Sequence, residues 1–355
     1  MSTLSGFFSG KRVLLTGHTG FKGAWAAHWL ASMGADVAGY ALPPDTTPSL
    51  FELCATSSIV KSNFGDVRDL GTLSRVMLEH HPEIVLHMAA QPLVRRSYRE
   101  PLATFETNVM GTANLLECVR HTPSVRAVVN VTSDKCYENR EQIEPYRESD
   151  PMGGHDPYSA SKGAAELVTA AYRASFLAER GVAVATARAG NVIGGGDWAE
   201  DRLIPDIVRG VTKGEVVHIR NPSSTRPWQH VLEPVAGYLL LARRLIEDPK
   251  RFVGGWNFGP DEGEAAVPAG EVALRFVGAL GRGELAIASQ SGAAVHEAKL
   301  LRLDSKKARN ELGWRPKLDL DGALALTAAF YRAHFEKPGT ERAILDEQLA
   351  QYQSP

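Results

Sequence analysis

Residues 12–23 read RVLLTGHTGFKG, and this stretch decides the fold. Arg12–Thr16 is an apolar run of strand length, and Ala24–Met33 has a helical pattern that ends near Gly34, a residue type common at helix ends. The loop between them has the spacing G-x-x-G-x-x-G. Glycines let a backbone turn tightly and approach a pyrophosphate, whose charge the N-terminus of the next helix stabilises. The stretch therefore predicts a strand, a loop and a helix that bind a dinucleotide.

The contacts expected from this loop are Gly17, Gly20, Phe21, Lys22 and Gly23. His18 and Lys22 are either phosphate contacts or exposed loop residues. An acid that binds the adenosine ribose is expected about 20 residues on, at the end of the second strand. Tyr40-Ala41-Leu42 stands there with no arginine in its place, so we expect NAD rather than NADP, held weakly. Asp66 and Val67 follow a predicted turn, and Asp66 either holds the adenine edge with Val67 or caps the loop.

Apolar runs and helical patterns alternate through the first half of the chain. The runs of strand length after the first are Val37–Leu42, Ile84–Met88, Ala127–Thr132 and Val182–Ala187. Residues 104–120 and Tyr158–Ala178 have helical spacing. This alternation predicts an α/β fold with a Rossmann-type, doubly wound, mainly parallel sheet.

After about residue 188 the pattern is less regular, with Gly194–Gly196 and several prolines. Glu233–Ile246 is a clear helix, and Asp304 precedes a short capped helix, Ser305–Leu312, that Gly313 closes. We expect residues 1–187, with a return segment at about 228–258, to form the NAD-binding domain. Residues 188–227 and 259–355 are expected to form a smaller C-terminal substrate lobe.

The composition excludes several classes of protein. The 355 residues carry 39 basic and 41 acidic side chains, a net charge of −2, so neither a nucleic-acid surface nor an acidic tail is indicated. No apolar run approaches the roughly 18 residues of a membrane helix. Cys54, Cys118 and Cys136 are far apart and lack metal-ligand spacing, so we expect no disulfide framework and no metal. These features predict a cytoplasmic protein.

Two short motifs carry candidate chemistry. Tyr158 and Lys162 lie four residues apart, so on a helix they share one face, and the ammonium lowers the pKa of the phenol toward a usable base. Thr132, Asp134 and Lys135 follow a strand, at the sheet edge where α/β enzymes bind ligands. There we expect Thr132 to hydrogen-bond a sugar hydroxyl beside Tyr158. Asp134 and Lys135 are then either an acid–base pair or a solvated salt-bridging turn.

Taken together, the motifs resemble the extended short-chain dehydrogenase/reductase family and, within it, the sugar-nucleotide 4,6-dehydratases. The matching stretches are Thr16–Gly23 (TGHTGFKG), Pro43–Leu53 (PPDTTPSLFEL), His87–Gln91 (HMAAQ), Thr132–Asn139 (TSDKCYEN), Arg188–Asp206 (RAGNVIGGGDWAEDRLIPD) and Arg226–Pro234 (RPWQHVLEP). They are spread over most of the chain. The resemblance also implies that Ala89 and Ala90 contact NAD.

The family implies a reaction in which NAD is reduced and reoxidised within one turnover. Tyr158, with Lys162, takes part in oxidation at C4 of a nucleotide-linked hexose, and Thr132 contacts the hydroxyl. Asp134 corresponds to the acid that protonates the departing C6 hydroxyl. Lys135 takes the position of the C5 base, which is glutamate in dTDP-sugar dehydratases, and lysine there matches the branch that acts on CDP-sugars.

For substrate and partners, the resemblance implies that Asn191, Arg202, Leu203 and Arg226 surround the nucleotide diphosphate. Arginine suits phosphate because its planar group donates two hydrogen bonds at once. The helices at 104–120 and 158–176 are expected either to pack in the core or to pair with a second subunit, giving a homodimer or a dimer of dimers through a four-helix interface.

Two rival functions remain open at this stage. A sugar-nucleotide 4-epimerase needs the glycine loop, Thr132, Tyr158 and Lys162, but no acid–base pair at Asp134-Lys135. A non-catalytic NAD-binding regulator on the same fold usually lacks the tyrosine or the lysine, and this chain has both.

Overall fold

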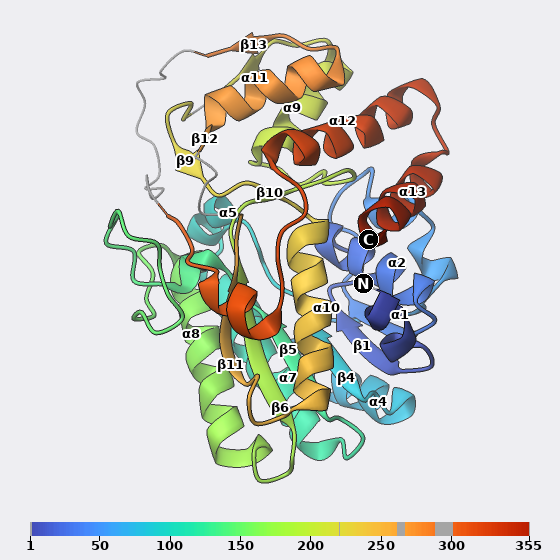
Figure 1. Ribbon diagram of the computed structural model, residues 1–355, viewed down its shortest axis with the longest axis vertical. Coiled ribbons are helices and arrows are strands. Elements are labelled where there is room, and N and C mark those ends of the chain that lie inside the picture. Colours follow the sequence, from blue (N-terminus) through green and yellow to red (C-terminus); the bar gives the residue numbers. More distant parts are fainter. Residues whose placement is uncertain (1, 220, 261–266, 288–300, 355) are drawn as a thin grey trace.

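The computed structural model describes residues 2–219, 221–260, 267–287 and 301–354. Its centre is a parallel sheet of seven strands in the order β11-β6-β5-β4-β1-β2-β3 (Figure 1). The strands are β1 Arg12–Thr16, β2 Asp36–Ala41, β3 Lys61–Phe64, β4 Ile84–His87, β5 Ala127–Val131, β6 Ala183–Ala189 and β11 Gly254–Phe258. All neighbouring pairs are parallel. The predicted Rossmann-type fold is confirmed.

Two strands of this sheet were not predicted as strands. β3 has the sequence KSNF and lies at the sheet edge with partly exposed side chains, so it lacks the apolar run of a buried strand. β11 has the sequence GGWNF and pairs with β6, although about 65 residues separate the two in the chain. Only the tertiary pairing identifies these segments as strands, because their own β-propensity is weak.

Helices cover both faces of the sheet, as a parallel sheet requires. Along β1, Leu14 packs toward α4 (Leu70–His80) and α7 (Gly111–His121), while its neighbours Val13 and Leu15 pack on the opposite face. That opposite face is covered by α2 (Phe21–Ser32) and α10 (Leu232–Glu247), which crosses in front of the sheet in Figure 1.

The two long helical patterns of the first half are present, and each contains a π-helical turn. Residues 101–121 run through α6 (Pro101–Phe105), η2 (Glu106–Met110) and α7. The second run consists of α8 (Pro157–Tyr172) and η4 (Arg173–Leu177). The predicted helix after Asp304 is short, with its cap formed by Lys306 N on Asp304 Oδ1 at 2.8 Å and its turn η5 at Ala308–Leu312.

The C-terminal part of the chain forms a second layer above the carboxyl ends of the strands (Figure 1). Its main helices are α9 (Leu203–Lys213), α11 (Ala269–Leu280), α12 (Leu320–Glu336) and α13 (Glu341–Gln353). Short pairs β9 (Thr225–Arg226) with β12 (Val267–Pro268), and β8 (Val217–His218) with β13 (Leu285–Ala286), complete it. No helix among the described residues is long and apolar enough to span a membrane.

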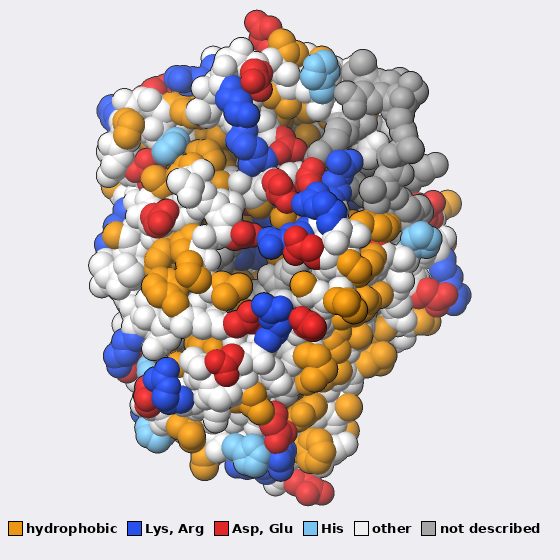
Figure 2. Space-filling model, turned by 180° about the vertical axis from the view of Figure 1, so that it is seen from behind, with side chains coloured by type: hydrophobic (Ala, Val, Ile, Leu, Met, Phe, Trp, Pro, Cys, Tyr) orange, Lys and Arg blue, Asp and Glu red, His pale blue; other side chains and the backbone are white. Residues whose placement is uncertain are grey.

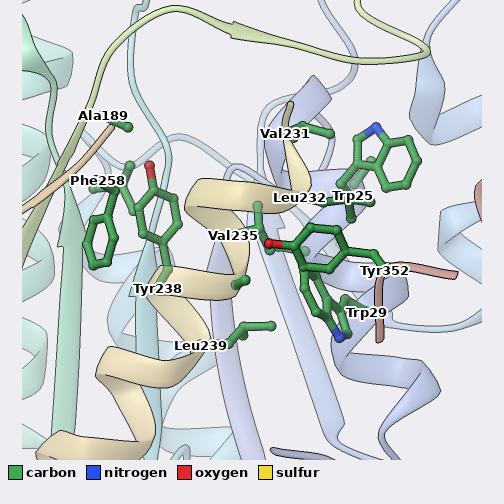
Figure 3. Close-up of a cluster of buried hydrophobic side chains, with 14 of the residues drawn as sticks. Trp25, Trp29, Ala189, Val231, Leu232, Val235, Tyr238, Leu239, Phe258 and Tyr352 are labelled. Atoms are coloured by element: carbon green, nitrogen blue, oxygen red, sulfur yellow. The ribbon is translucent and has the colours of Figure 1, made fainter. Parts of the chain in front are cut away.

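The last helix is anchored back on the sheet half of the molecule. Figure 3 shows Trp25 and Trp29 of α2 and Tyr352 of α13 packed beside the apolar face of α10, which includes Val235 and Leu239. The Tyr352 hydroxyl donates to the buried Glu233 carboxylate at 2.6 Å, which also accepts from the backbone of residues 317 and 318. These contacts fix the second layer over the strand ends.

Candidate active site

A cavity of about 690 Å³ lies at the carboxyl ends of the strands, between the sheet and the second layer. Its wall contains every site residue predicted from the sequence, from the glycine loop to the arginines of the C-terminal half. Figure 2 shows the molecule hollowed near the middle of this face, with basic and acidic side chains around the opening. The position agrees with the rule that open parallel sheets bind ligands at this edge.

The glycine loop fits the pyrophosphate of a dinucleotide. Gly17 has φ +76°, and a Cβ on it would lie 2.7 Å from the backbone nitrogen of Ala89. A Cβ on Gly23 would lie 2.0 Å from the Gly17 carbonyl oxygen. Only glycine at these two positions lets the first turn of α2 pack this closely on β1 and β4, with its unpaired N–H groups at the cavity. Such a helix start is a ready site for phosphate.

The loop side chains His18 and Lys22 lie in different surroundings. The His18 ring packs over Gly39, where a Cβ would lie 2.3 Å from it, and its Nε2 is 2.6 Å from Ser62 Oγ. Burial lowers the pKa of His18 to about 4. His18 is thus a neutral packing residue outside the cavity wall. Lys22 does line the cavity, where burial and then the charges of Arg202 and Lys162 lower its pKa to about 8.

Asp66 and Val67, which follow β3, line the cavity as expected. The Asp66 carboxylate caps its own loop, because it accepts from the backbone nitrogen of Arg68 at 2.9 Å and pairs with the Arg68 guanidinium at 2.6 Å. Hydrogen bonding to Arg68 holds the pKa of Asp66 below its usual value. β2 ends at Ala41 without a carboxylate, so the weak hold on NAD stays a prediction.

Tyr158 lies in the first turn of α8, whose N-terminus is capped by Asp156 through the backbone nitrogen of Ser159 at 2.9 Å. The phenol is 7% exposed, and burial raises the pKa of Tyr158 to about 12, against a lowering effect of its hydrogen bond with Ser133. Lys162 follows one turn later. Burial lowers the pKa of Lys162 to about 8, and its Nζ donates to the Val131 carbonyl at 3.3 Å.

The hydroxyl beside Tyr158 belongs to Ser133, which the sequence reasoning did not select. Thr132 lines the cavity, but its hydroxyl donates to Glu166 Oε1 at 2.5 Å and is not beside the phenol. The alternation of side chains along β5 places residues 132 and 133 on opposite sides, but which of them faces α8 is set by a long-range contact. Residues 128, 130 and 132 share one side of an extended chain, and Asn130 already contacts Thr169 of α8 there, so 133 points the other way.

Asp134 and Lys135 both lie in the cavity wall on a single 3₁₀ turn, η3 (Asp134–Cys136). Asp134 is 2% exposed, and burial raises its pKa even though the charges of Lys135 and Arg226 act against this. Its Oδ1 accepts from Ser133 Oγ at 3.0 Å. Among the described residues, its Oδ2 has no hydrogen-bond partner. A buried acid with one unused oxygen is suited to donate a proton to a ligand.

The second layer supplies the remaining predicted residues. Arg202 precedes α9 and is held by Asp197 at 2.8 Å, and Leu203 is the first residue of that helix. Arg226, on β9, lies near enough to Asp134 to lower its pKa. The backbone oxygen of Asn191 accepts from residue 229 at 3.1 Å, which fixes that loop beside β6.

Three arginines of α5 (Val94–Arg99) were also missed. Arg95 and Arg96 line the cavity and pair with Asp201 at 3.7 Å and with Asp45 at 2.9 Å. Arg99 pairs with Glu200 at 2.8 Å. These pairs join α5 to the loops on both sides of the opening. The cluster is visible in the sequence shortly after HMAAQ, but the three carboxylates that it pairs with across the opening lie 51 to 106 residues away.

Comparison with known proteins identifies the family. The model of the NAD dependent epimerase/dehydratase family matches residues 13–255. The chain belongs to this family. It is 50% identical over 332 residues to the CDP-glucose 4,6-dehydratase of Salmonella typhimurium, covering 92% of each chain. It is 29% identical over 266 residues to the UDP-glucose 4-epimerase of Halalkalibacterium halodurans, covering 71% of this chain and 77% of that one.

Among epimerase/dehydratase structures, the dTDP-glucose 4,6-dehydratase DesIV of Streptomyces venezuelae, with NAD and TYD bound, superimposes with a TM-score of 0.76. The identity is 25%, and the match covers 92% of this chain and 99% of that one. The predicted family resemblance, the fold and NAD as the cofactor are therefore confirmed. The roles of individual site residues stay predictions.

Proposed function

We propose that the protein is a CDP-glucose 4,6-dehydratase, which converts CDP-glucose to CDP-4-keto-6-deoxyglucose and water. The observation that carries the proposal is Asp134 beside the Tyr158–Lys162 pair: a buried acid with a raised pKa and an unused oxygen in the cavity wall. Simple oxidation or epimerisation at C4 needs no such acid. The 50% identity to a relative of that name supports the choice of substrate.

NAD would be held by the glycine loop and the start of α2, together with Asp66, Val67, Ala89, Ala90 and Lys162. Bound there, NAD supplies a temporary store for the electron pair that leaves C4 and returns at C6. The cavity wall around it excludes water, since Tyr158, Asp134 and Lys162 are each under 10% exposed. Exclusion of water strengthens every charge interaction in the site.

For the oxidation, Tyr158 takes the proton of the C4 hydroxyl. Burial opposes this by raising the pKa of the phenol, which is about 12 with every neighbour's effect included. The hydrogen bond with Ser133 and the charge of Arg202 act in the opposite direction. Ser133, rather than Thr132, is then the hydroxyl that orients the sugar beside the phenol.

For the elimination, the new 4-ketone makes the C5 hydrogen acidic. Lys135 takes the C5 proton, and Asp134 gives its own proton to the departing C6 hydroxyl, which leaves as water. Burial raises the pKa of Asp134, which favours the protonated form that the elimination requires. When the electron pair returns at C6, Lys135 gives a proton, exchanged with solvent, back to C5. The proton that Tyr158 took from the C4 hydroxyl then balances the proton lost by Asp134, and the site returns to its starting state by proton exchange with solvent.

The nucleotide diphosphate would lie against Arg202 and Arg226, with Asn191 and Leu203 beside it. Asp197 holds Arg202 at 2.8 Å and is itself 3% exposed, so the guanidinium is oriented before the substrate binds. Pre-orientation reduces the entropy lost on binding.

The test is an assay of purified protein with NAD and a panel of CDP-, dTDP- and UDP-glucose, following the 4-keto-6-deoxy product. Product from CDP-glucose at the highest kcat/KM supports the proposal. The second candidate, a 4-epimerase, is favoured by the 29% identical relative. A galactose epimer in place of the keto sugar would establish that candidate, and binding of NAD without turnover would indicate a non-catalytic protein.

We also propose that the protein forms a homodimer, or a dimer of dimers, through a four-helix interface. Exposed apolar side chains lie on the two helical runs 101–121 and 157–177: Leu102 (76% exposed), Phe105 (37%), Met110 (55%), Leu167 (63%) and Phe176 (45%). Figure 2 shows hydrophobic side chains gathered along that side of the molecule. Exposed apolar groups gathered in this way usually mark an interface.

The proposed compartment is the cytoplasm. The three cysteines are unpaired and buried, which suits a reducing compartment. Recovery of the protein in the soluble cell fraction would support this, and export from the cell would contradict it.

A further inference from the structure

Glu166 lies on α8, one helical turn after Lys162, and forms a buried ion pair with Arg188 of β6. The guanidinium donates to both carboxylate oxygens, Nε to Oε1 at 2.8 Å and Nη2 to Oε2 at 2.7 Å. Both side chains are about 5% exposed. Such a two-point pair has a fixed geometry, because both donors and both acceptors are rigid and planar.

Each oxygen of Glu166 also accepts a threonine hydroxyl. Thr132 donates to Oε1 at 2.5 Å, and Thr186 of β6 donates to Oε2 at 2.7 Å. Burial alone would raise the pKa of Glu166, but the hydrogen bonds and charge of Arg188 and the two hydroxyls hold it below its usual value. The carboxylate is therefore ionised and fully paired.

Arg188, the other partner of this ion pair, also holds Tyr137. Arg188 Nη1 donates to the Tyr137 hydroxyl at 2.7 Å, and that hydroxyl donates to Asn257 Oδ1, also at 2.7 Å. The guanidinium lies over the Tyr137 ring, 5.0 Å from its centre. Tyr137 is 1% exposed.

Residues 132–137, which we call the catalytic turn, are thus held at both ends by one ion pair. Between these ends lie Ser133, Asp134 and Lys135, on a backbone whose only regular element is the single turn η3. Glu166 belongs to the helix that carries Tyr158 and Lys162. The pair therefore joins the segment with the acid and amine directly to the helix with the oxidation pair.

We propose that Glu166 and Arg188 are positioning residues, which fix the catalytic turn against α8 through Thr132 at one end and Tyr137 at the other. Thr132 then acts through Glu166 and not on the sugar. The consequence for turnover rests on the proposed dehydratase function. The consequence for the order of the turn does not.

Thr132→Val tests this inference, and Thr186→Val is its matched control. Each variant keeps the shape of a buried threonine and removes one hydroxyl from the same carboxylate, but only Thr132 belongs to the catalytic turn. Displacement of reacting groups by about 1 Å can cost on the order of 10²-fold in rate. We expect Thr132→Val to lower kcat for CDP-glucose by roughly 10-fold to 100-fold, with KM within about 2-fold. Thr186→Val should stay within about 2-fold in both, and Thr132→Ser should restore kcat.

A second readout needs no activity. Cys136 lies in the catalytic turn and is 0% exposed, while Cys54 and Cys118 are buried elsewhere, at 0% and 2%. A thiol reagent applied to the folded protein, with peptide mass spectrometry, reports each cysteine separately. In Thr132→Val, Cys136 should react on the order of 10-fold faster, because local opening of the turn exposes it. Cys54 and Cys118 should keep their rates, whereas general unfolding would speed up all three.

Equal kcat for Thr132→Val and Thr186→Val, together with unchanged labelling of Cys136, would overturn the inference while the dehydratase function stands. If the wild-type protein makes no product from CDP-glucose, the proposed function fails. The labelling of Cys136 then still decides whether the ion pair holds the turn.

Discussion

The Ser133 hydroxyl donates to Asp134 Oδ1 at 3.0 Å, while Asp134 Oδ2 has no hydrogen-bond partner among the described residues. One carboxylate oxygen is thus fixed by the protein, and the other oxygen of this cavity-wall residue is left without such a bond. Because burial raises the pKa of this acid, it can carry a proton to a leaving group. In the proposed mechanism, this acid is required for the elimination and not for the oxidation.

Asp134→Asn with Lys135→Met should block elimination and spare oxidation. The double variant removes the acid and the amine, whereas Tyr158, Lys162 and Ser133 remain. Loss of acid–base help is expected to lower product formation by on the order of 10²–10⁴-fold. On mixing with CDP-glucose, reduced nicotinamide absorbance should accumulate in a single turnover, read by stopped flow. Rapid product formation would mean that other residues carry out the elimination.

Tyr158→Phe should lower turnover by on the order of 10²-fold or more, because the C4 hydroxyl loses its base. Tyr172→Phe is the matched control, since it removes the same atom from the same helix at a residue outside the cavity wall. The control should keep normal turnover in a steady-state assay. Near-normal turnover in Tyr158→Phe would remove Tyr158 from the mechanism.

Lys162→Met should abolish turnover but stabilise the cofactor-free protein at pH 7. Burial lowers the pKa of Lys162 to about 8, so its charged form is disfavoured in the folded state. Below pH 8 that penalty is present in full. Between pH 8 and about 10.4 the unfolded chain binds the proton and the folded protein does not, so wild-type stability rises with pH and the advantage of the variant shrinks.

Thermal unfolding scans measure this effect. We expect the melting temperature of Lys162→Met to exceed that of the wild type by roughly 2 °C or more at pH 7. The difference should be smaller at pH 10. A lower melting temperature for the variant at pH 7 would show that the ammonium stabilises the fold.

Leu102→Glu with Leu167→Glu should dissociate the proposed dimer, because each places a charge on the exposed apolar side chains of the two helical runs. Ile143→Glu is the control. Ile143 is 77% exposed and lies in a loop that belongs to neither run. Light scattering after gel filtration should give a dimer for the wild type and the control and a monomer for the double variant. A monomeric wild type would contradict the interface.

Local sequence patterns predicted the parts of the site that depend on near neighbours. The spacing of Gly17, Gly20 and Gly23 predicted the tight loop between β1 and α2, where the packing requires glycine at positions 17 and 23. The four-residue spacing of Tyr158 and Lys162 placed both on one face of α8, where the structure has them. The strands β1, β4 and β5 were found within one residue because they are continuous apolar runs.

Other parts of the site depend on contacts with residues that are distant in the sequence. The choice between Thr132 and Ser133 was set by Glu166, 34 residues away, which takes the threonine hydroxyl. His18 belongs to a phosphate loop by sequence, but its ring fills the space over Gly39 on the next strand. No local pattern contains these contacts, because they arise only when the sheet and its helices are assembled.

In the proposed mechanism one site oxidises C4, eliminates water across C5 and C6, and reduces C6 without net redox change. CDP-glucose with deuterium at C4 tests it most directly, with the position of the label in the product read by NMR and mass spectrometry. We expect the deuterium at C6 of the 4-keto-6-deoxy sugar in the same molecule, with one solvent hydrogen at C5. Loss of the label to NAD that leaves the protein, or its retention at C4 in a galactose product, would rule out this mechanism.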